Sequence, residues 1–266
     1  MAEITKTANG TPVWITGEGP PVILVHGVLM DHRMWDAQVA MLSDSYRVIC
    51  LDMLGHGDAP NPPGERTLAD FIGQIEEVVA EYCVGARPVL GGFSMGGLIT
   101  QAFGVTHHRD LAGLIILNAV YDRNSDEAAV VRERSKMMVV EGVNATIDGA
   151  RTRWFREDEA ASHGAVVEEI CGWMLDGDFI AKCKAHWVFA TSDDQVAGLL
   201  GNISCPTLIM TGDGDAGSTP HMSEAMAHAI PNSELHILDL QQHMMPVIDS
   251  IRVTGLIRSF LDRVTV

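Results

Sequence analysis

Basic residues are scarce in this sequence. Its 266 residues include 18 Lys and Arg against 35 Asp and Glu, which gives a formal net charge of −17. Only four of the basic residues are lysines. A charge of this sign and size repels phosphate backbones and anionic membrane surfaces. We therefore expect no nucleic acid and no membrane among the partners of this protein.

Paired cysteines and long apolar runs are also missing. The five cysteines are scattered without a C-x-x-C pair, which is typical of free thiols in a reducing compartment rather than of disulfides or a zinc site. The longest apolar runs, such as residues 22–25 and 114–117, are far shorter than the ~20 residues that span a bilayer. The first residues show neither the basic nor the apolar region of a signal peptide. The sequence therefore predicts a cytoplasmic protein.

Short apolar runs alternate with helical patterns through both ends of the chain. Between the runs, residues 67–82 place apolar side chains on one helical face, with Thr67 as the candidate N-cap. Seven segments have the pattern of strands, several of them with the continuous apolar runs of strands buried on both faces. These segments are residues 11–16, 22–25, 47–51, 88–90, 114–117, 207–210 and 234–238. The alternation indicates a mostly parallel α/β sheet.

One long stretch interrupts this alternation. Residues 122–200 contain no candidate strand, and their pattern indicates several helices rich in large apolar side chains and arginines. We predict a core domain of residues 1–121 and 201–266, with a helical cap of residues 122–200 inserted into it. Insertions of this size in α/β enzymes commonly cover the ligand site, so we expect a lid.

The most informative motif is Gly-Phe-Ser-Met-Gly at residues 92–96. It directly follows the candidate strand 88–90 and opens a helical stretch at residues 95–107. A sharp strand-to-helix turn forces the central Ser94 into a strained backbone conformation, and the flanking glycines remove side-chain clashes. The hydroxyl then lies at a helix N-terminus, where the dipole favours developing negative charge. We predict that Ser94 is a nucleophile.

A serine hydroxyl needs a base that accepts its proton. His243 lies in a loop between the last candidate strand and a helix, where the base belongs if the chain order is Ser, acid, His. The acid that orients the imidazole stays open on spacing alone. Asp213 and Asp215 both follow one candidate strand in a glycine-rich loop, and Asp122 follows another.

Backbone N–H groups should stabilise the oxyanion that forms when the nucleophile attacks a carbonyl. The Met95 N–H directly follows the nucleophile and is one expected donor. The loop after strand 22–25 reads His-Gly-Val-Leu, in which Gly27 allows close backbone approach and Val28 is the second expected donor. His26 is expected to brace this loop rather than to act as a base.

Together these motifs resemble the α/β-hydrolase superfamily, in its order and over nearly the whole chain. They are Val25-His26-Gly27, Asp52-Met53-Leu54-Gly55-His56-Gly57, the Ser94 pentapeptide, Gly212-x-x-Asp215 and the late His243. The resemblance implies an eight-stranded, mostly parallel sheet with helices on both faces and a helical cap inserted after the sixth strand. It also favours Asp215 over Asp213, because the family's acid commonly ends a Gly-x-x-Asp turn.

Within that superfamily the chain is most similar to 3-oxoadipate enol-lactonases and related small-molecule carboxylesterases. The similarity rests on Asp-His-Arg-Met-Trp at residues 31–35, on residues 94–97, and on Arg-Trp-Phe at residues 153–155. Asp58 departs from the usual Ser after Gly-His-Gly, and residues 241–245 replace the usual loop around the histidine. The resemblance implies acyl-enzyme hydrolysis of a small ester or lactone by a Ser-His-Asp triad, without metal or cofactor.

The predicted cap supplies candidate residues for the substrate pocket. They are Trp154, Phe155, Arg153 and Trp187. Arg153 belongs to a basic cluster with Arg151 and Arg156 in an otherwise acidic chain. This cluster is either a solvated helix face, or one of its members pairs with a substrate carboxylate.

Other functions use the same fold and motifs. A C–C hydrolase of β-diketones or ring-cleavage products would use the same triad, and a cofactor-free perhydrolase commonly shares Gly-Phe-Ser-Met-Gly. A non-catalytic ligand receptor of this fold is a third alternative. The sequence leaves the oligomeric state open, with a homo-oligomer among the alternatives, and the expected ligand in every case is a small molecule.

Overall fold

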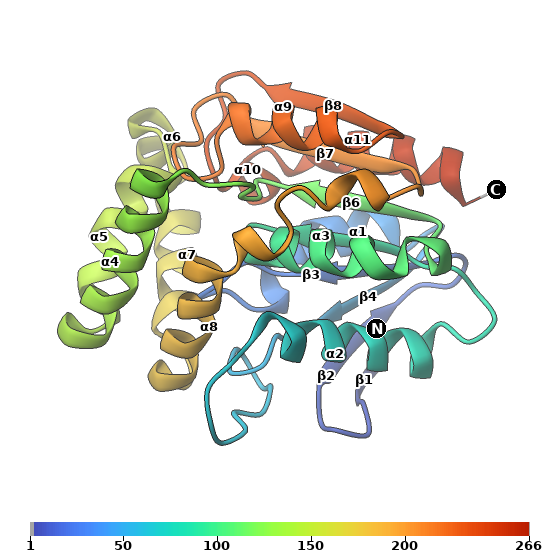
Figure 1. The fold of residues 1–266 in the computed structure, drawn as a ribbon, viewed down its shortest axis with the longest axis horizontal. Helices are drawn as coiled ribbons and strands as arrows, with labels where there is room; N and C mark the ends of the chain where they lie inside the picture. Colours follow the sequence, from blue (N-terminus) through green and yellow to red (C-terminus); the bar gives the residue numbers. More distant parts are fainter. Residues whose placement is uncertain (1–2, 266) are drawn as a thin grey trace.

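The computed structural model describes residues 3–265, which form an eight-stranded sheet with helices on both faces (Figure 1). The strands are β1 (Glu3–Lys6), β2 (Pro12–Thr16), β3 (Pro21–Val25), β4 (Arg47–Leu51), β5 (Val89–Phe93), β6 (Gly113–Leu117), β7 (Thr207–Gly212) and β8 (Ser233–Leu238). Their order across the sheet is β1-β2-β4-β3-β5-β6-β7-β8. β2 runs antiparallel to both of its neighbours, and the strands from β4 to β8 pair in parallel. The predicted mostly parallel α/β sheet is confirmed.

The central strands are buried because they are apolar at successive positions. Every residue of β3, β5, β6 and β7 is buried, as expected for strands covered by helices on both faces. β1 is different, since it is an edge strand whose four residues are mostly exposed. The sequence prediction missed β1 because Glu-Ile-Thr-Lys contains no apolar run.

Helices cover both faces of the sheet. In Figure 1, α2 (Leu68–Tyr82), α3 (Met95–His107) and α9 (Pro220–Ala229) lie in front of it, and α1 (Asp36–Leu42) and α11 (Ser250–Val264) lie behind. The remaining short elements are α10 (Met245–Ile248) and the 3-10 turns His32–Trp35, His108–Asp110, Asp193–Gln195 and Leu200–Asn202. Thr67 precedes α2 as predicted, and its N–H donates to the Asp70 carboxylate at 2.7 Å. Within residues 3–265, no helix is both long enough and apolar enough to cross a membrane.

The segment between β6 and β7 is helical, as predicted. Residues 122–200 hold five helices and, among the described residues, no strand. The helices are α4 (Ser125–Glu141), α5 (Val143–Trp154), α6 (Glu157–Ser162), α7 (Gly164–Leu175) and α8 (Phe179–Thr191). Figure 1 shows them gathered at one side of the sheet. We call residues 122–200 the helical insertion.

A buried ion pair joins the two ends of the helical insertion. The Arg123 guanidinium lies 3.0 Å from the carboxylate of Asp193, and the Arg123 backbone N–H donates to the same carboxylate at 3.0 Å. Both side chains are buried. The guanidinium also lies 4.6 Å from the centre of the Phe189 ring, which adds a cation–π contact. The pair therefore ties the start of the insertion to its end.

Replacing Arg123 with alanine should lower the free energy of unfolding by about 3–5 kcal/mol, because Asp193 would keep a buried and unpaired charge. Arg151→Ala is the matched control, since Arg151 pairs with Glu168 at the surface, where ion pairs contribute little. Urea unfolding followed by circular dichroism measures both losses. Equal losses in the two variants would show that the Arg123 pair does not hold the insertion together.

Candidate active site

Ser94 stands between β5 and α3 in a backbone conformation that side chains rarely adopt, with φ 54° and ψ −114°. A Cβ added at Gly92 would lie 2.1 Å from the Gly96 carbonyl oxygen, and one at Gly96 would lie 2.3 Å from the Val25 carbonyl oxygen. Both positions therefore require glycine. The Ser94 N–H donates to the Leu117 carbonyl at 2.9 Å, which fixes the turn to β6. Such a tightly held, strained turn is typical of a functional site.

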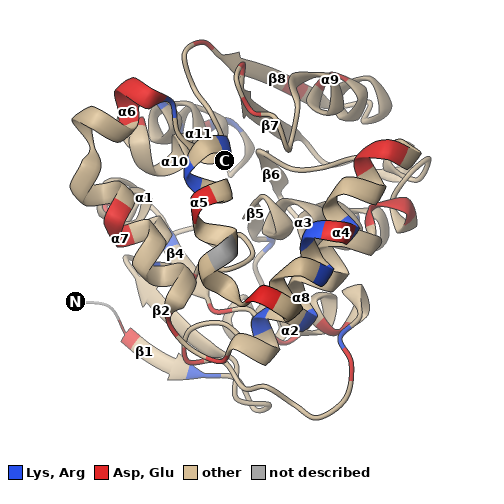
Figure 2. Cartoon of the chain, turned by 90° about the vertical axis from the view of Figure 1, so that its left-hand side faces the viewer, with Lys and Arg blue, Asp and Glu red and all other residues tan. Residues whose placement is uncertain are grey.

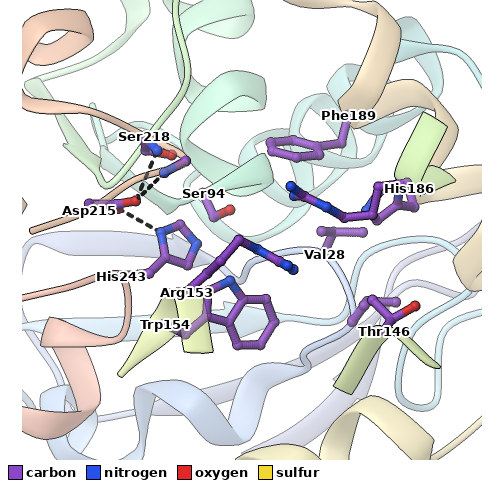
Figure 3. Close-up of a pocket in the computed structure, with 13 residues that line it drawn as sticks. Val28, Ser94, Thr146, Arg153, Trp154, His186, Phe189, Asp215, Ser218 and His243 are labelled. Carbon is purple, nitrogen blue, oxygen red and sulfur yellow. Dashed lines mark hydrogen bonds and ion pairs between the residues drawn. The ribbon is translucent and has the colours of Figure 1, made fainter. Parts of the chain in front are cut away.

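His243 and Asp215 form a buried pair next to this turn. His243 Nδ1 lies 2.7 Å from Asp215 Oδ2, and both side chains are more than nine-tenths buried. Asp215 Oδ2 also accepts a hydrogen bond from the Asn118 amide at 2.9 Å. Its other oxygen accepts the backbone N–H groups of Gly217 and Ser218, each at 2.9 Å. Figure 3 shows the Asp215 carboxylate with Ser218 on one side and His243 on the other.

These contacts keep Asp215 ionised. Burial alone would raise the pKa of this carboxyl, but the charge and hydrogen bond of His243, the Ser218 N–H and the Asn118 amide hold its pKa below the ordinary value. A carboxylate at this place holds the proton on His243 Nδ1 and leaves Nε2 as the basic nitrogen. The pair can thus serve as a general base.

The structure brings Asp215, and neither of the other two candidate acids, against His243. Asp213 is exposed and accepts a hydrogen bond from the Gln241 N–H. Asp122 is also exposed. Spacing alone left three candidate acids open, and the one that the structure pairs with His243 is Asp215, which the family resemblance also favours.

The residues of the two expected oxyanion donors lie near Ser94, one in the chain and one in the pocket. Met95 is the first residue of α3 and directly follows Ser94, and Val28 lines the same pocket as Ser94. A Cβ added at Gly27 would lie 2.8 Å from the Phe93 ring, so the loop approaches β5 as closely as it does because residue 27 is glycine. Leu29 follows Val28 in this loop, and its N–H already donates to His56 Nε2 at 3.1 Å.

His26 braces this loop, as the sequence suggested. Its Nε2 accepts the Met53 N–H at 2.9 Å, so its Nδ1 carries the proton that is donated to the Gly27 carbonyl at 2.8 Å. Burial lowers the pKa of His26 and keeps the ring neutral. Both ring nitrogens are used, which leaves none for proton transfer.

The pocket above Ser94 lies between the loops of the sheet and the helical insertion (Figure 3). From the sheet side it is lined by Val28, Leu29, Ser94, Asp215, Gly217, Ser218 and His243. From the insertion it is lined by Arg134, Thr146, Arg153, Trp154, His186 and Phe189. The Trp154 and His243 rings are stacked with their centroids 5.7 Å apart. The insertion therefore supplies one whole wall of the pocket.

Two of the four predicted pocket residues of the insertion line the pocket, and two do not. Arg153 and Trp154 lie in its wall. Phe155 is buried in the hydrophobic core, because α5 ends at the residue before it and the backbone becomes extended. Trp187 is 44% exposed and lies in a separate surface groove. Successive helical residues point about 100° apart, so α8 turns Trp187 outward where it turns His186 inward. The predictions for Phe155 and Trp187 are corrected accordingly.

The three arginines of the predicted cluster have different surroundings. Arg151 and Arg156 form ion pairs at the surface, with Glu168 and Asp158. Arg153 instead is half-buried in the pocket wall, and its Nε has no hydrogen-bond partner among the described residues. The interpretation as a solvated surface thus fits Arg151 and Arg156, and of the three arginines only Arg153 reaches the pocket.

A second arginine, Arg134 of α4, lines the same pocket. Neither it nor Arg153 forms an ion pair within residues 3–265. Burial and the charge of Arg134 lower the pKa of Arg153 to about 10, and burial also lowers the pKa of Arg134. Figure 2 shows that α4 carries acidic as well as basic residues, but among the described residues of the insertion the charged side chains that line this pocket are Arg134 and Arg153. The pocket wall is therefore locally positive.

Sequence reasoning did not single out Arg134, Asn118 or His186 as site residues. Asn118 had a usable signal, since it directly follows the strand that ends at residue 117, where polar side chains meet at the carboxyl edge of a parallel sheet. Arg134 and His186 had none, because their position depends on how α4 and α8 pack against the sheet loops.

The chain is similar to known hydrolases in sequence and in fold. Residues 22–252 match the profile of the alpha/beta hydrolase family. The chain is 30% identical over 247 residues to (E)-2-((N-methylformamido)methylene)succinate hydrolase from Acinetobacter baylyi, covering 92% of each chain. It is 26% identical to 3-oxoadipate enol-lactonase 2 from the same organism, over 83% of this chain and 80% of the relative. A thermophilic esterase from Thermogutta terrifontis, solved with malate bound, superposes with a TM-score of 0.88 at 30% identity over both whole chains.

Proposed function

The chain belongs to the alpha/beta hydrolase family, and on that premise we propose that it is a serine hydrolase that cleaves a small carboxylic ester or lactone. The observation that carries this proposal is the shared pocket of Ser94, in its strained turn, and the buried His243–Asp215 pair. A nucleophile, a base and an acid that orients the base are the parts that acyl transfer through a covalent intermediate needs.

The first half of the reaction forms an acyl-enzyme. His243 Nε2 accepts the Ser94 hydroxyl proton while Oγ attacks the carbonyl carbon of the ester. The N–H groups of Val28 and Met95 donate to the oxyanion of the tetrahedral intermediate. When the intermediate collapses, the carbon–oxygen bond to the leaving group breaks, and His243 returns its proton to the departing alkoxide or enolate.

The second half releases the acid and restores the enzyme. Water replaces the leaving group, and His243 accepts its proton as the oxygen attacks the acyl carbon. Collapse of the second tetrahedral intermediate frees the carboxylic acid and returns the proton to Ser94. Asp215 stays ionised throughout and stabilises the imidazolium in both halves.

The substrate that fits this pocket carries a carboxylate. Arg134 and Arg153 bring positive charge into the pocket of Ser94 without an acidic partner among the described residues. A partly buried cation is costly unless an anion pairs with it. Guanidinium groups bind carboxylates with two parallel hydrogen bonds. The names of two similar proteins support a substrate with a carboxylate. One is the hydrolase of a methylenesuccinate, and the other is an esterase solved with malate bound. Both of these compounds are dicarboxylates.

We also propose that residues 122–200 act as a lid and that the protein works in the cytoplasm. The pocket wall supplied by α4, α5 and α8 supports the first point, because a substrate in the pocket would be enclosed between these helices and the sheet loops. All five cysteines are free and buried, which fits the reducing compartment expected from the sequence.

The substrate class has a direct kinetic test. The p-nitrophenyl monoester of succinic acid and p-nitrophenyl butyrate have acyl groups of equal chain length, and only the first bears a carboxylate. Arg153→Ala should raise KM for the succinate ester about 10- to 100-fold, the loss expected for hydrogen bonds to a charged group. The KM for the butyrate ester should change little.

Arg151→Ala is the control for this test, since it removes an arginine from the same helix that points to the surface. It should leave both KM values close to wild type. If Arg153→Ala impairs the two esters equally, carboxylate recognition by Arg153 is excluded and only the esterase proposal stands.

A further inference from the structure

His186 is a buried polar side chain that the proposed reaction does not use. It lies on α8, lines the pocket with Ser94, and is 4% exposed. Its Nδ1 has no hydrogen-bond partner among the described residues. Figure 3 shows the imidazole in the wall formed by the helical insertion. Polar side chains buried to this degree are hydrogen-bonded in the great majority of proteins, so a histidine of the pocket wall with an unpaired nitrogen is a candidate for a hydrogen bond to a ligand.

The charged groups that shift the pKa of His186 are all positive. Burial, followed by the charges of Arg134, Arg123 and Arg153, lowers the pKa of His186 to about 3. Arg123 is paired with Asp193, whereas the two arginines that share the pocket with His186 have no acidic partner within residues 3–265. The ring is therefore neutral at pH 7 and carries one N–H donor and one acceptor nitrogen.

A neutral donor suits a position beside two partly buried cations. A third cation would add like-charge repulsion and a further desolvation cost. An acidic side chain would pair with the arginines and repel an anionic substrate. Histidine in its neutral form adds a hydrogen-bond donor without adding charge. Its ring packs against Phe189 in a T-shaped arrangement with the centroids 5.9 Å apart, which restrains its orientation.

We propose that His186 determines substrate specificity by donating its ring N–H to the substrate carboxylate that Arg134 and Arg153 attract. The three side chains then form one anionic subsite, with two cations and one neutral donor facing an acceptor that offers about four lone-pair positions. This inference rests on the proposed function, because it requires the carboxylate to enter the pocket of Ser94. The contact lies away from the scissile bond, so it acts on substrate and transition state alike and changes KM rather than kcat.

His186→Phe tests the proposal, since it keeps an aromatic ring of similar size and removes both nitrogens. KM for the p-nitrophenyl monoester of succinic acid should rise about 10-fold, with kcat within about twofold of wild type and KM for p-nitrophenyl butyrate unchanged. His186→Asn retains an N–H donor and should recover part of the loss. His163→Asn, at the exposed end of α6, is the control and should behave as wild type.

Binding of succinate, measured by isothermal titration calorimetry, gives a readout that does not depend on turnover. The Kd of the wild-type protein should rise about 10-fold in His186→Phe and less in His186→Asn. Equal Kd values for wild type and His186→Phe, absence of succinate binding to the wild type, or equal impairment of both esters would each overturn the proposal. Absence of Ser94-dependent ester hydrolysis in the wild type would contradict the proposed function instead, and the succinate comparison would then decide the role of His186 alone.

Discussion

Ser94→Ala should lower kcat for the p-nitrophenyl monoester of succinic acid by about 10⁴- to 10⁶-fold, to the rate that binding and oxyanion stabilisation alone support. The loss is this large because no other group can form the acyl-enzyme once Oγ is gone. His243 and Asp215 keep their hydrogen bond in the variant, since neither of them depends on the Ser94 hydroxyl for that contact.

The fold should survive this substitution. Alanine removes one oxygen and leaves the backbone turn, which is fixed by Gly92, Gly96 and the Ser94 N–H bond to Leu117. Thermal unfolding checks this point, and the melting temperature should stay near the wild-type value. Substantial turnover by a folded Ser94→Ala protein would remove Ser94 from the mechanism.

Asp215→Asn should lower kcat by about 10³- to 10⁴-fold, although asparagine has nearly the same shape. An amide in place of the carboxylate no longer stabilises the imidazolium. It can also donate to His243 Nδ1, which moves the ring proton to Nε2, the nitrogen that must accept the proton of Ser94. Steady-state kinetics with the succinate ester measure the change.

Asp213→Asn is the matched control for this prediction. Asp213 lies two residues away in the same loop but is exposed and does not contact His243. Its substitution should leave kcat within about threefold of wild type, since surface substitutions away from special contacts have small effects. A larger loss in Asp213→Asn than in Asp215→Asn would mean that the acid has been assigned to the wrong residue.

The residues around Ser94 and His243 could be predicted because their signals are local. The Ser94 turn needs glycines at fixed offsets between a strand and a helix, and His243 needs a loop after the last strand. Asp215 needed the family resemblance in addition, because Asp213 has the same local setting. β1 was not predicted because it has no strong local signal, since an exposed edge strand needs no apolar pattern.

The pocket wall could be predicted only in part, because the helices of the insertion are apolar on more than one face. α4 buries Met138 and exposes Val140 to 83%, and α8 buries Val188 and exposes Trp187. Periodicity therefore does not show which face of either helix meets the sheet. The inward positions of Arg134 and His186 follow from the packing of these helices, which the local sequence does not specify.

Labelling with a fluorophosphonate tests directly whether Ser94 is an activated nucleophile. The reagent phosphonylates an activated serine and releases fluoride, and the adduct can be located by mass spectrometry of the digested protein. We expect one adduct per chain, on the peptide that contains Ser94, and none in Ser94→Ala. Labelling of His243→Ala should be much slower, because the hydroxyl then lacks its base. An adduct on another residue, or equally fast labelling of Ser94→Ala, would contradict the assignment of Ser94 as the nucleophile.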